Sequence, residues 1–186
     1  MRILISNDDG IESPGLLALV YELEPQHEVW VTAPDRERSG MSHSITLRDP
    51  VRFRQIDERK FACDGTPADT VLYALLGAIP VQPDLIISGI NRGPNLGTDI
   101  IYSGTAAAAR QGALVGIPSI AVSVAPLKPP FPFERAAAFI RDNINLFLSL
   151  WNSNHFINVN FPPPYERVNK VAITHPSRRI YSDKAE

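Results

Sequence analysis

The chain has 186 residues, 44% of them apolar, which suits a single α/β-sized domain with a substantial core. Its 18 lysines and arginines and 20 aspartates and glutamates give a formal net charge of −2. The chain lacks the block of basic residues that is typical of nucleic-acid-binding proteins, so we expect no stable nucleic-acid partner. Cys63 is the only cysteine, which excludes an intramolecular disulfide and a cysteine-based zinc site and predicts a buried thiol in a reducing compartment.

Short apolar runs predict at least five strands, rich in isoleucine and valine and separated in several places by helix-like segments. These strands are expected at residues 2–6, 28–33, 84–90, 119–124 and 156–161. The alternation is typical of an α/β fold. Because the strands are apolar on both faces, we expect a Rossmann-like, doubly wound, mostly parallel sheet.

Four segments carry helix signals. They are expected at residues 13–23, 66–78, 103–116 and 134–150. Ser13 is the expected N-cap of the first, with Pro14 at the first helical position, and Thr66 and Pro67 repeat that arrangement in the second.

Two further segments have strand-like alternation. Residues 44–65 alternate apolar and polar side chains, which predicts an antiparallel hairpin excursion from the sheet. Near the end of the chain, Lys170–Thr174 predicts one more strand, and polar residues follow without a closing element.

Two adjacent carboxylates, Asp8 and Asp9, follow the first expected strand. Like charges about 4 Å apart repel by about 1 kcal/mol in water and by about 4 kcal/mol at an effective dielectric constant of 20. No lysine or arginine closely flanks the pair in sequence, which favours a divalent cation, and carboxylates suit Mg²⁺, Mn²⁺ or Ca²⁺. The alternative is a solvated turn in which one aspartate caps the next helix, and these residues alone do not decide between the two.

The second expected strand leads into a polar loop at what should be the carboxyl edge of the sheet, where open α/β sheets bind ligands. The Ser39 hydroxyl could bind a metal or a phosphate, or Ser39 could be an ordinary surface serine. Arg36 and Arg38 could reach an anionic substrate or be solvated. His43 could shuttle a proton or be an ordinary loop histidine.

A long polar loop with glycines at every fourth position follows the third of these strands. It is neither a G-x-G-x-x-G fingerprint nor a P-loop, and it carries Asn91 and Asn95, whose amides can bind a metal or an oxyanion. Ser103, Gly104 and Thr105 then open an alanine-rich helix, whose N-terminus favours an anion. In the competing interpretation the glycines only make turns and Ser103 is only an N-cap.

Three strand ends thus offer oxygen ligands and a place for an anion, which indicates metal-assisted phosphate chemistry. Rival interpretations are a phosphatase with an aspartyl-phosphate intermediate, a nucleotide or metal sensor without turnover, and a structural module. The haloacid-dehalogenase motif, two aspartates separated by one residue, is not met here. A structural module leaves the aspartate pair and the long loop unexplained.

Several of these segments, in this order, resemble the SurE family of survival proteins, which are metal-dependent 5'-nucleotidases. The resemblance covers roughly residues 1–160 and rests on the following stretches: "MRILISNDDGIESPG", "VTAPDRERSGMSHSIT", "GTPADTV", "SGINRGPNLGTDIIYSGTAAAA" and "IPSIAVS". It implies hydrolysis of nucleoside 5'-monophosphates to nucleoside and phosphate. Some members also act on 3'-nucleotides or short polyphosphate.

The resemblance also implies the residues of the site. One Mg²⁺ or Mn²⁺ per subunit is expected on Asp8, Asp9, Ser39 and Asn91. The phosphate is expected on Asn95, Ser103, Gly104 and Thr105. Asp8 or Asp9 is the expected catalytic residue, accepting a proton from the attacking water or orienting it.

The rest of the chain sets expectations about assembly and location. The resemblance implies a homodimer or homotetramer, and we expect residues 1–186 to form a single SurE-like domain in which the family's carboxyl-terminal hairpin and subunit-embracing segment are not found. The first residues lack a signal-peptide layout, and no stretch approaches the roughly 18 apolar residues of a membrane span. We therefore expect a soluble cytoplasmic protein with nucleoside monophosphates as partners and no membrane.

Overall fold

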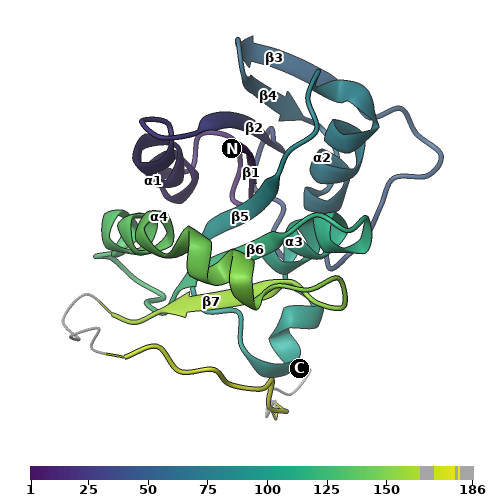
Figure 1. The fold of residues 1–186 in the computed structure, drawn as a ribbon. Helices are drawn as coiled ribbons and strands as arrows, with labels where there is room; N and C mark the ends of the chain where they lie inside the picture. The colour runs from purple at the N-terminus through teal and green to yellow at the C-terminus, as the bar shows by residue number, and fades with distance from the viewer. Residues whose placement is uncertain (164–169, 179, 181–186) are drawn as a thin grey trace.

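The computed structural model describes residues 1–163, 170–178 and 180. Within these residues, a seven-stranded sheet has the order β3-β4-β2-β1-β5-β6-β7 (Figure 1). The strands are β1 (Arg2–Ser6), β2 (Glu28–Pro34), β3 (Phe53–Asp57), β4 (Lys60–Cys63), β5 (Leu85–Arg92), β6 (Ser119–Val124) and β7 (Ile157–Phe161). Neighbouring strands are parallel except β3 and β4. The expected fold class is therefore confirmed.

Helices cover both faces of the sheet (Figure 1). On one face, α1 (Pro14–Leu23) and α4 (Phe133–Leu150) enclose a core that includes Ile3 and Ile5. On the other, α2 (Pro67–Tyr73) and α3 (Gly104–Leu114) pack over Leu4 and Ile86. A short π-helical segment, η1 (Ala74–Ala78), continues α2, and a 3-10 helix, η2 (Gly97–Ile101), precedes α3. Neighbouring residues of β1 thus point into opposite cores, as strand geometry requires.

The four expected helices are confirmed, and side-chain caps mark where α1, α2 and α3 begin, whereas α4 begins after Pro132 without one. Ser13 Oγ accepts a hydrogen bond from the Leu16 amide at the start of α1. At α2, Thr66 and Asp69 form a capping box, in which each side chain accepts from the other residue's backbone amide. None of the helices over the described residues is both long and apolar enough to span a membrane.

The two segments with strand-like alternation have different outcomes. The expected hairpin is present as β3 and β4, and it extends the main sheet because β4 pairs in parallel with β2. The expected strand at Lys170–Thr174 is wrong, since these residues form no strand and are exposed. Val171 and Ile173 remain 60% and 86% exposed, so the alternation buries no face there. Cys63 is a free, fully buried thiol at the end of β4, as expected.

Candidate functional site

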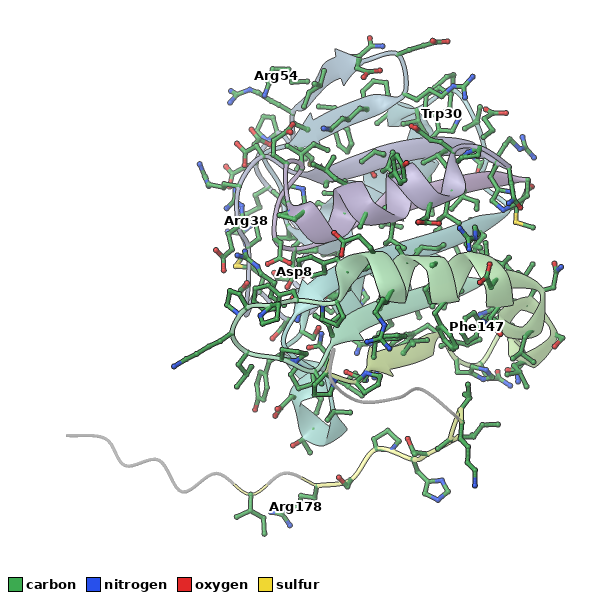
Figure 2. The ribbon with its side chains drawn as sticks, turned by 90° about the vertical axis from the view of Figure 1, so that its left-hand side faces the viewer. Asp8, Trp30, Arg38, Arg54, Phe147 and Arg178 are labelled. Atoms are coloured by element: carbon green, nitrogen blue, oxygen red, sulfur yellow. The ribbon has the colours of Figure 1, made fainter. Side chains whose placement is uncertain are left out.

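The turn after β1 is fixed by its own polar side chains. Asn7 Nδ2 donates to the Gly10 carbonyl at 3.0 Å and to Ser13 Oγ at 2.6 Å. Gly10 has a φ of +106°, a left-handed conformation that favours glycine. This turn directs Asp8 and Asp9 out of strand geometry at the carboxyl end of β1. Figure 2 shows Asp8 and Arg38 at the same end of the ribbon.

Asp8 is buried against the start of α3. Asp8 is only 4% exposed, and its Oδ1 accepts a 2.5 Å hydrogen bond from Thr105 Oγ1. A Cβ on Gly104 would lie 2.7 Å from Asp8 Cβ and 2.9 Å from Asp8 Oδ2, so only glycine permits this approach. Burial raises the pKa of Asp8 to about 6; the Thr105 hydrogen bond lowers that pKa and the Asp9 charge raises it.

Asp9 is paired with an arginine that comes from a neighbouring strand. Arg92 Nη2 and Nε donate to the same oxygen, Asp9 Oδ1, at 3.1 Å and 3.3 Å. Burial raises the pKa of Asp9, the Arg92 contacts lower it, and the Glu37 charge raises it. The expectation that a cation is needed because no basic residue flanks the pair was therefore incomplete. β5 lies beside β1 and brings Arg92 to Asp9.

Two of the expected metal ligands lie next in sequence to residues that contact the aspartates. The Arg38 amide donates to the Asp8 carbonyl at 2.7 Å, so the backbone that directly precedes Ser39 contacts the pair. Ser39 is exposed, and its Oγ donates to Glu37 Oε1 at 3.0 Å. Asn91 directly precedes Arg92, and its Nδ2 donates to the Gly93 carbonyl at 2.9 Å. Three loops thus converge on the aspartates.

Asn95 is held by residues of β6 and β7, the last two strands at one edge of the sheet. Its Nδ2 donates to Ser123 Oγ at 2.8 Å, and its backbone amide donates to Asn160 Oδ1 at 2.8 Å. Its carbonyl accepts from Asn158 Nδ2 at 2.8 Å and from Asn160 Nδ2 at 3.1 Å. The structure therefore gives Asn95 a role in fixing the glycine loop (residues 89–97), and its contact with phosphate stays a prediction.

The start of α3 combines a cap with a link to the aspartates. Ser103 Oγ accepts from the Ala106 amide at 3.0 Å, so the expected N-cap role is observed. The Thr105 hydroxyl donates its hydrogen bond to Asp8 Oδ1. The first amides of a helix lack carbonyl partners within it, so this N-terminus retains the character of an anion site.

The remaining polar residues of the second loop have structural contacts. His43 Nε2 lies 2.9 Å from Gln111 Oε1, and His43 Nδ1 lies 3.4 Å from Arg110 Nη1, so both ring nitrogens contact α3. Arg38 Nη2 donates to the Asp64 carbonyl at 2.6 Å. The side chain of Arg36 is 68% exposed. Proton transfer by His43 and substrate contact by the arginines stay predictions.

Sequence reasoning missed Arg92, Glu37, Asn158 and Asn160. Arg92 directly follows Asn91 and Glu37 lies two residues before Ser39, and this proximity to expected ligands was the available signal. Asn158 and Asn160 are separated by one residue on an apolar strand and therefore share a face of β7, a signal that does not name their partner.

The oxygen atoms of this site fit a hard divalent cation. No cluster of three histidine, cysteine, aspartate or glutamate side chains suited to a metal occurs among the described residues, so neutral ligands must join the two aspartates. Thr105 engages Asp8 Oδ1 and Arg92 engages Asp9 Oδ1, which leaves each Oδ2 outside those contacts. Asp8 Oδ2 faces the space that a side chain at Gly104 would fill. Carboxylate, hydroxyl and amide oxygens suit Mg²⁺ and Mn²⁺.

The fold and site define a Rossmann-like α/β protein with an oxygen-rich acidic site beside a helix N-terminus. The family model described as "Survival protein SurE" matches residues 3–183. The chain therefore belongs to the SurE family, as its sequence motifs predicted.

Individual relatives agree with this assignment. A protein named 5'-nucleotidase SurE from Desulforudis audaxviator is 48% identical over 172 residues, covering 88% of this chain and 66% of the relative. A protein of the same name from Thermosipho melanesiensis is 42% identical over 193 residues, covering 100% of this chain and 75% of the relative. The crystal structure of SurE protein from Aquifex aeolicus has a TM-score of 0.89 at 40% identity, covering 97% of this chain and 74% of that one. The chain thus spans about two thirds to three quarters of these relatives' lengths.

Proposed function

We propose that this chain is a metal-dependent 5'-nucleotidase that hydrolyses nucleoside 5'-monophosphates to nucleoside and phosphate. The observation that carries the proposal is the contact between Asp8, at the carboxyl end of β1, and Thr105, in the first turn of α3. It puts a buried carboxylate, suited to a cation, against a helix N-terminus, suited to a phosphate. The relatives named 5'-nucleotidase SurE support the assignment.

Asp8, Asp9, Ser39 and Asn91 would hold one Mg²⁺ or Mn²⁺ in each subunit. Such an ion, when bound, polarises a phosphoryl oxygen and lowers the pKa of a water molecule. The α3 N-terminus, with Ser103, Gly104 and Thr105, would bind the phosphate oxygens together with Asn95 of the glycine loop. Asp8 or Asp9 would orient the attacking water or accept its proton, and the contact of Asp8 with the start of α3, the proposed phosphate position, supports this role.

Phosphate release from a panel of 5'- and 3'-mononucleotides and short polyphosphates tests the activity. We expect release from 5'-mononucleotides that stops with EDTA and returns with Mg²⁺ or Mn²⁺. The ranking within the panel then defines the range of substrates. A sensor would bind nucleotide without releasing phosphate, and an aspartyl-phosphate enzyme would transfer solvent oxygen into a carboxylate.

The family resemblance supports further proposals about the whole protein. We expect one domain that assembles as a homodimer or homotetramer and acts in the cytoplasm. Light scattering coupled to size-exclusion chromatography tests the assembly, and cell fractionation tests the location.

A further inference from the structure

We propose that Arg92 and Glu37 are positioning residues that set the divalent-cation affinity of the aspartate site in opposite directions. The aspartate site means Asp8, Asp9, Ser39 and Asn91. The inference rests on the proposed function, because it assumes that this site binds a cation. It concerns two charged residues outside the expected set of ligands and phosphate contacts.

Arg92 orients Asp9 while placing a positive charge beside it. Both of its bonds reach Oδ1, at 3.1 Å and 3.3 Å, which fixes the carboxylate without engaging Oδ2. The Asp9 side chain is 5% exposed and that of Arg92 is 42% exposed, so the pair lies at the edge of solvent. A cation at Oδ2 would gain an oriented ligand but would be repelled by the guanidinium a few ångströms away.

Glu37 lies in the loop after β2 and acts on the site through Ser39. Its Oε1 accepts the Ser39 hydroxyl hydrogen at 3.0 Å, so the lone pairs of Ser39 Oγ are left for a cation. The Arg38 amide, between these two residues, donates to the Asp8 carbonyl and holds this turn against the aspartates. The Glu37 charge also acts on Asp9. Glu37 therefore adds negative charge and orients a neutral ligand, and both effects favour cation binding.

Charge should outweigh orientation at Arg92, because the guanidinium repels a doubly charged ion while the orienting contact is half exposed. Removing one unit charge near a divalent ion at the protein surface should change its dissociation constant by about threefold to tenfold at low salt. Removing the Glu37 charge should raise the dissociation constant by the same factor by which removing the Arg92 charge lowers it. A variant lacking both charges should bind with nearly the original affinity.

The test is a Mn²⁺ titration of metal-stripped protein, with no nucleotide present, at neutral pH and low salt. We expect Arg92→Gln to lower the Mn²⁺ dissociation constant by about threefold to tenfold, Glu37→Gln to raise it by as much, and the double variant to lie near the parent. Arg92→Lys retains the charge, so its affinity for Mn²⁺ should equal that of the parent. Arg54→Gln on β3, which Figure 2 shows far from Asp8, and Glu58→Gln in the β3–β4 turn are charge-matched controls.

The outcomes separate this inference from the proposed function. If the parent binds Mn²⁺ and the Arg92 and Glu37 variants bind it with unchanged affinity, or both shift in the same direction, the inference is wrong and the function stands. If the parent binds no Mn²⁺, both are overturned. Urea unfolding of each metal-free variant identifies any that fails to fold, and a second neutral variant, Arg92→Met or Glu37→Met, then carries the comparison at that position.

Discussion

The Thr105 hydroxyl donates a 2.5 Å hydrogen bond to Asp8 Oδ1 and thereby joins two segments that lie 97 residues apart in the chain. The bond connects the first turn of α3 to the turn after β1. It fixes one oxygen of a buried carboxylate and leaves the other facing the space beside Gly104. The cation and phosphate parts of the proposed site are therefore held in one arrangement.

Thr105→Val should reduce nucleotide turnover at least tenfold, because it removes this donor with little change in side-chain volume. Hydrogen bonds to charged groups contribute about 1.5 to 3 kcal/mol, which corresponds to about tenfold or more in rate if the orientation of Asp8 is lost. Steady-state phosphate release measures the effect. Thr105→Ser keeps the hydroxyl and should retain most of the activity; equal loss in both variants would contradict a role for this bond.

Gly104→Ala should abolish tight Mn²⁺ binding. The added Cβ would lie within 2.9 Å of Asp8 Oδ2 and 2.7 Å of Asp8 Cβ, so the carboxylate must move. Overpacking of this kind also costs about 1 to 3 kcal/mol of stability. Mn²⁺ titration and thermal unfolding report the two effects separately. An unchanged dissociation constant would show that Asp8 Oδ2 does not bind the cation.

Asp8→Asn should make the metal-free protein more stable than the parent at neutral pH. Folding raises the pKa of Asp8 from 3.8 to about 6, so ionisation of this carboxyl opposes folding. The contribution of the Asp8 carboxyl to the stability of the parent is fully present below about pH 4 and is lost as pH rises through about 6. A shift of about two pKa units lowers the free energy of unfolding of the parent by about 3 kcal/mol at pH 7. The Asp8→Asn variant does not undergo this loss, because asparagine does not ionise.

Urea unfolding in EDTA between pH 4 and pH 7 measures this difference. Asp84→Asn is the control of opposite sign, because hydrogen bonds from Arg2 lower the pKa of Asp84. The contribution of Asp84 is present at neutral pH and declines as pH falls. The Asp8→Asn advantage should therefore grow between pH 4 and pH 7, while the Asp84→Asn difference should stay nearly constant there, because the contribution of Asp84 is lost only as pH falls through its lowered pKa. A pH-independent difference for Asp8→Asn would contradict the assigned burial effect.

Asn160→Ala should loosen the glycine loop. Asn160 Oδ1 accepts from the Asn95 amide, and leaving a buried amide unsatisfied costs about 1 to 3 kcal/mol, whereas the Asn95 carbonyl keeps Asn158 Nδ2 as a donor. We expect faster hydrogen exchange at the Asn95 amide and a higher KM for the nucleotide. Asn154→Ala, at an exposed position just before β7, is the matched control. Unchanged exchange at Asn95 would rule out this role for Asn160.

The elements that sequence predicted well have local causes. The caps at Ser13 and Thr66 act within three residues, so they mark where α1 and α2 begin without knowledge of the fold. Lys170–Thr174 shows the limit of such signals. Alternation indicates that a segment can form a strand, but it does not identify a strand for it to pair with, and none pairs with it among the described residues.

The site shows the same limit. The sequence identified Asp8 and Asp9 because both follow an apolar strand directly. It did not reveal the Arg92 contact, which depends on β5 lying beside β1 with Ser88 paired to Ser6. That register places Arg92 and Asp9 at nearly the same distance beyond the paired residues. Strand order is set by the packing of the whole sheet, so this ion pair could not be read from spacing along the chain.

Phosphate release from a nucleoside 5'-monophosphate, by metal-stripped parent, Asp8→Asn and Asp9→Asn proteins with and without added Mn²⁺, tests the central claim most directly. We predict release by the parent only when Mn²⁺ is present, and a loss of at least a hundredfold in each variant although both remain folded. Mn²⁺-independent release by the parent, or parental rates in both variants with normal Mn²⁺ binding, would contradict the assignment of these aspartates as the cation site.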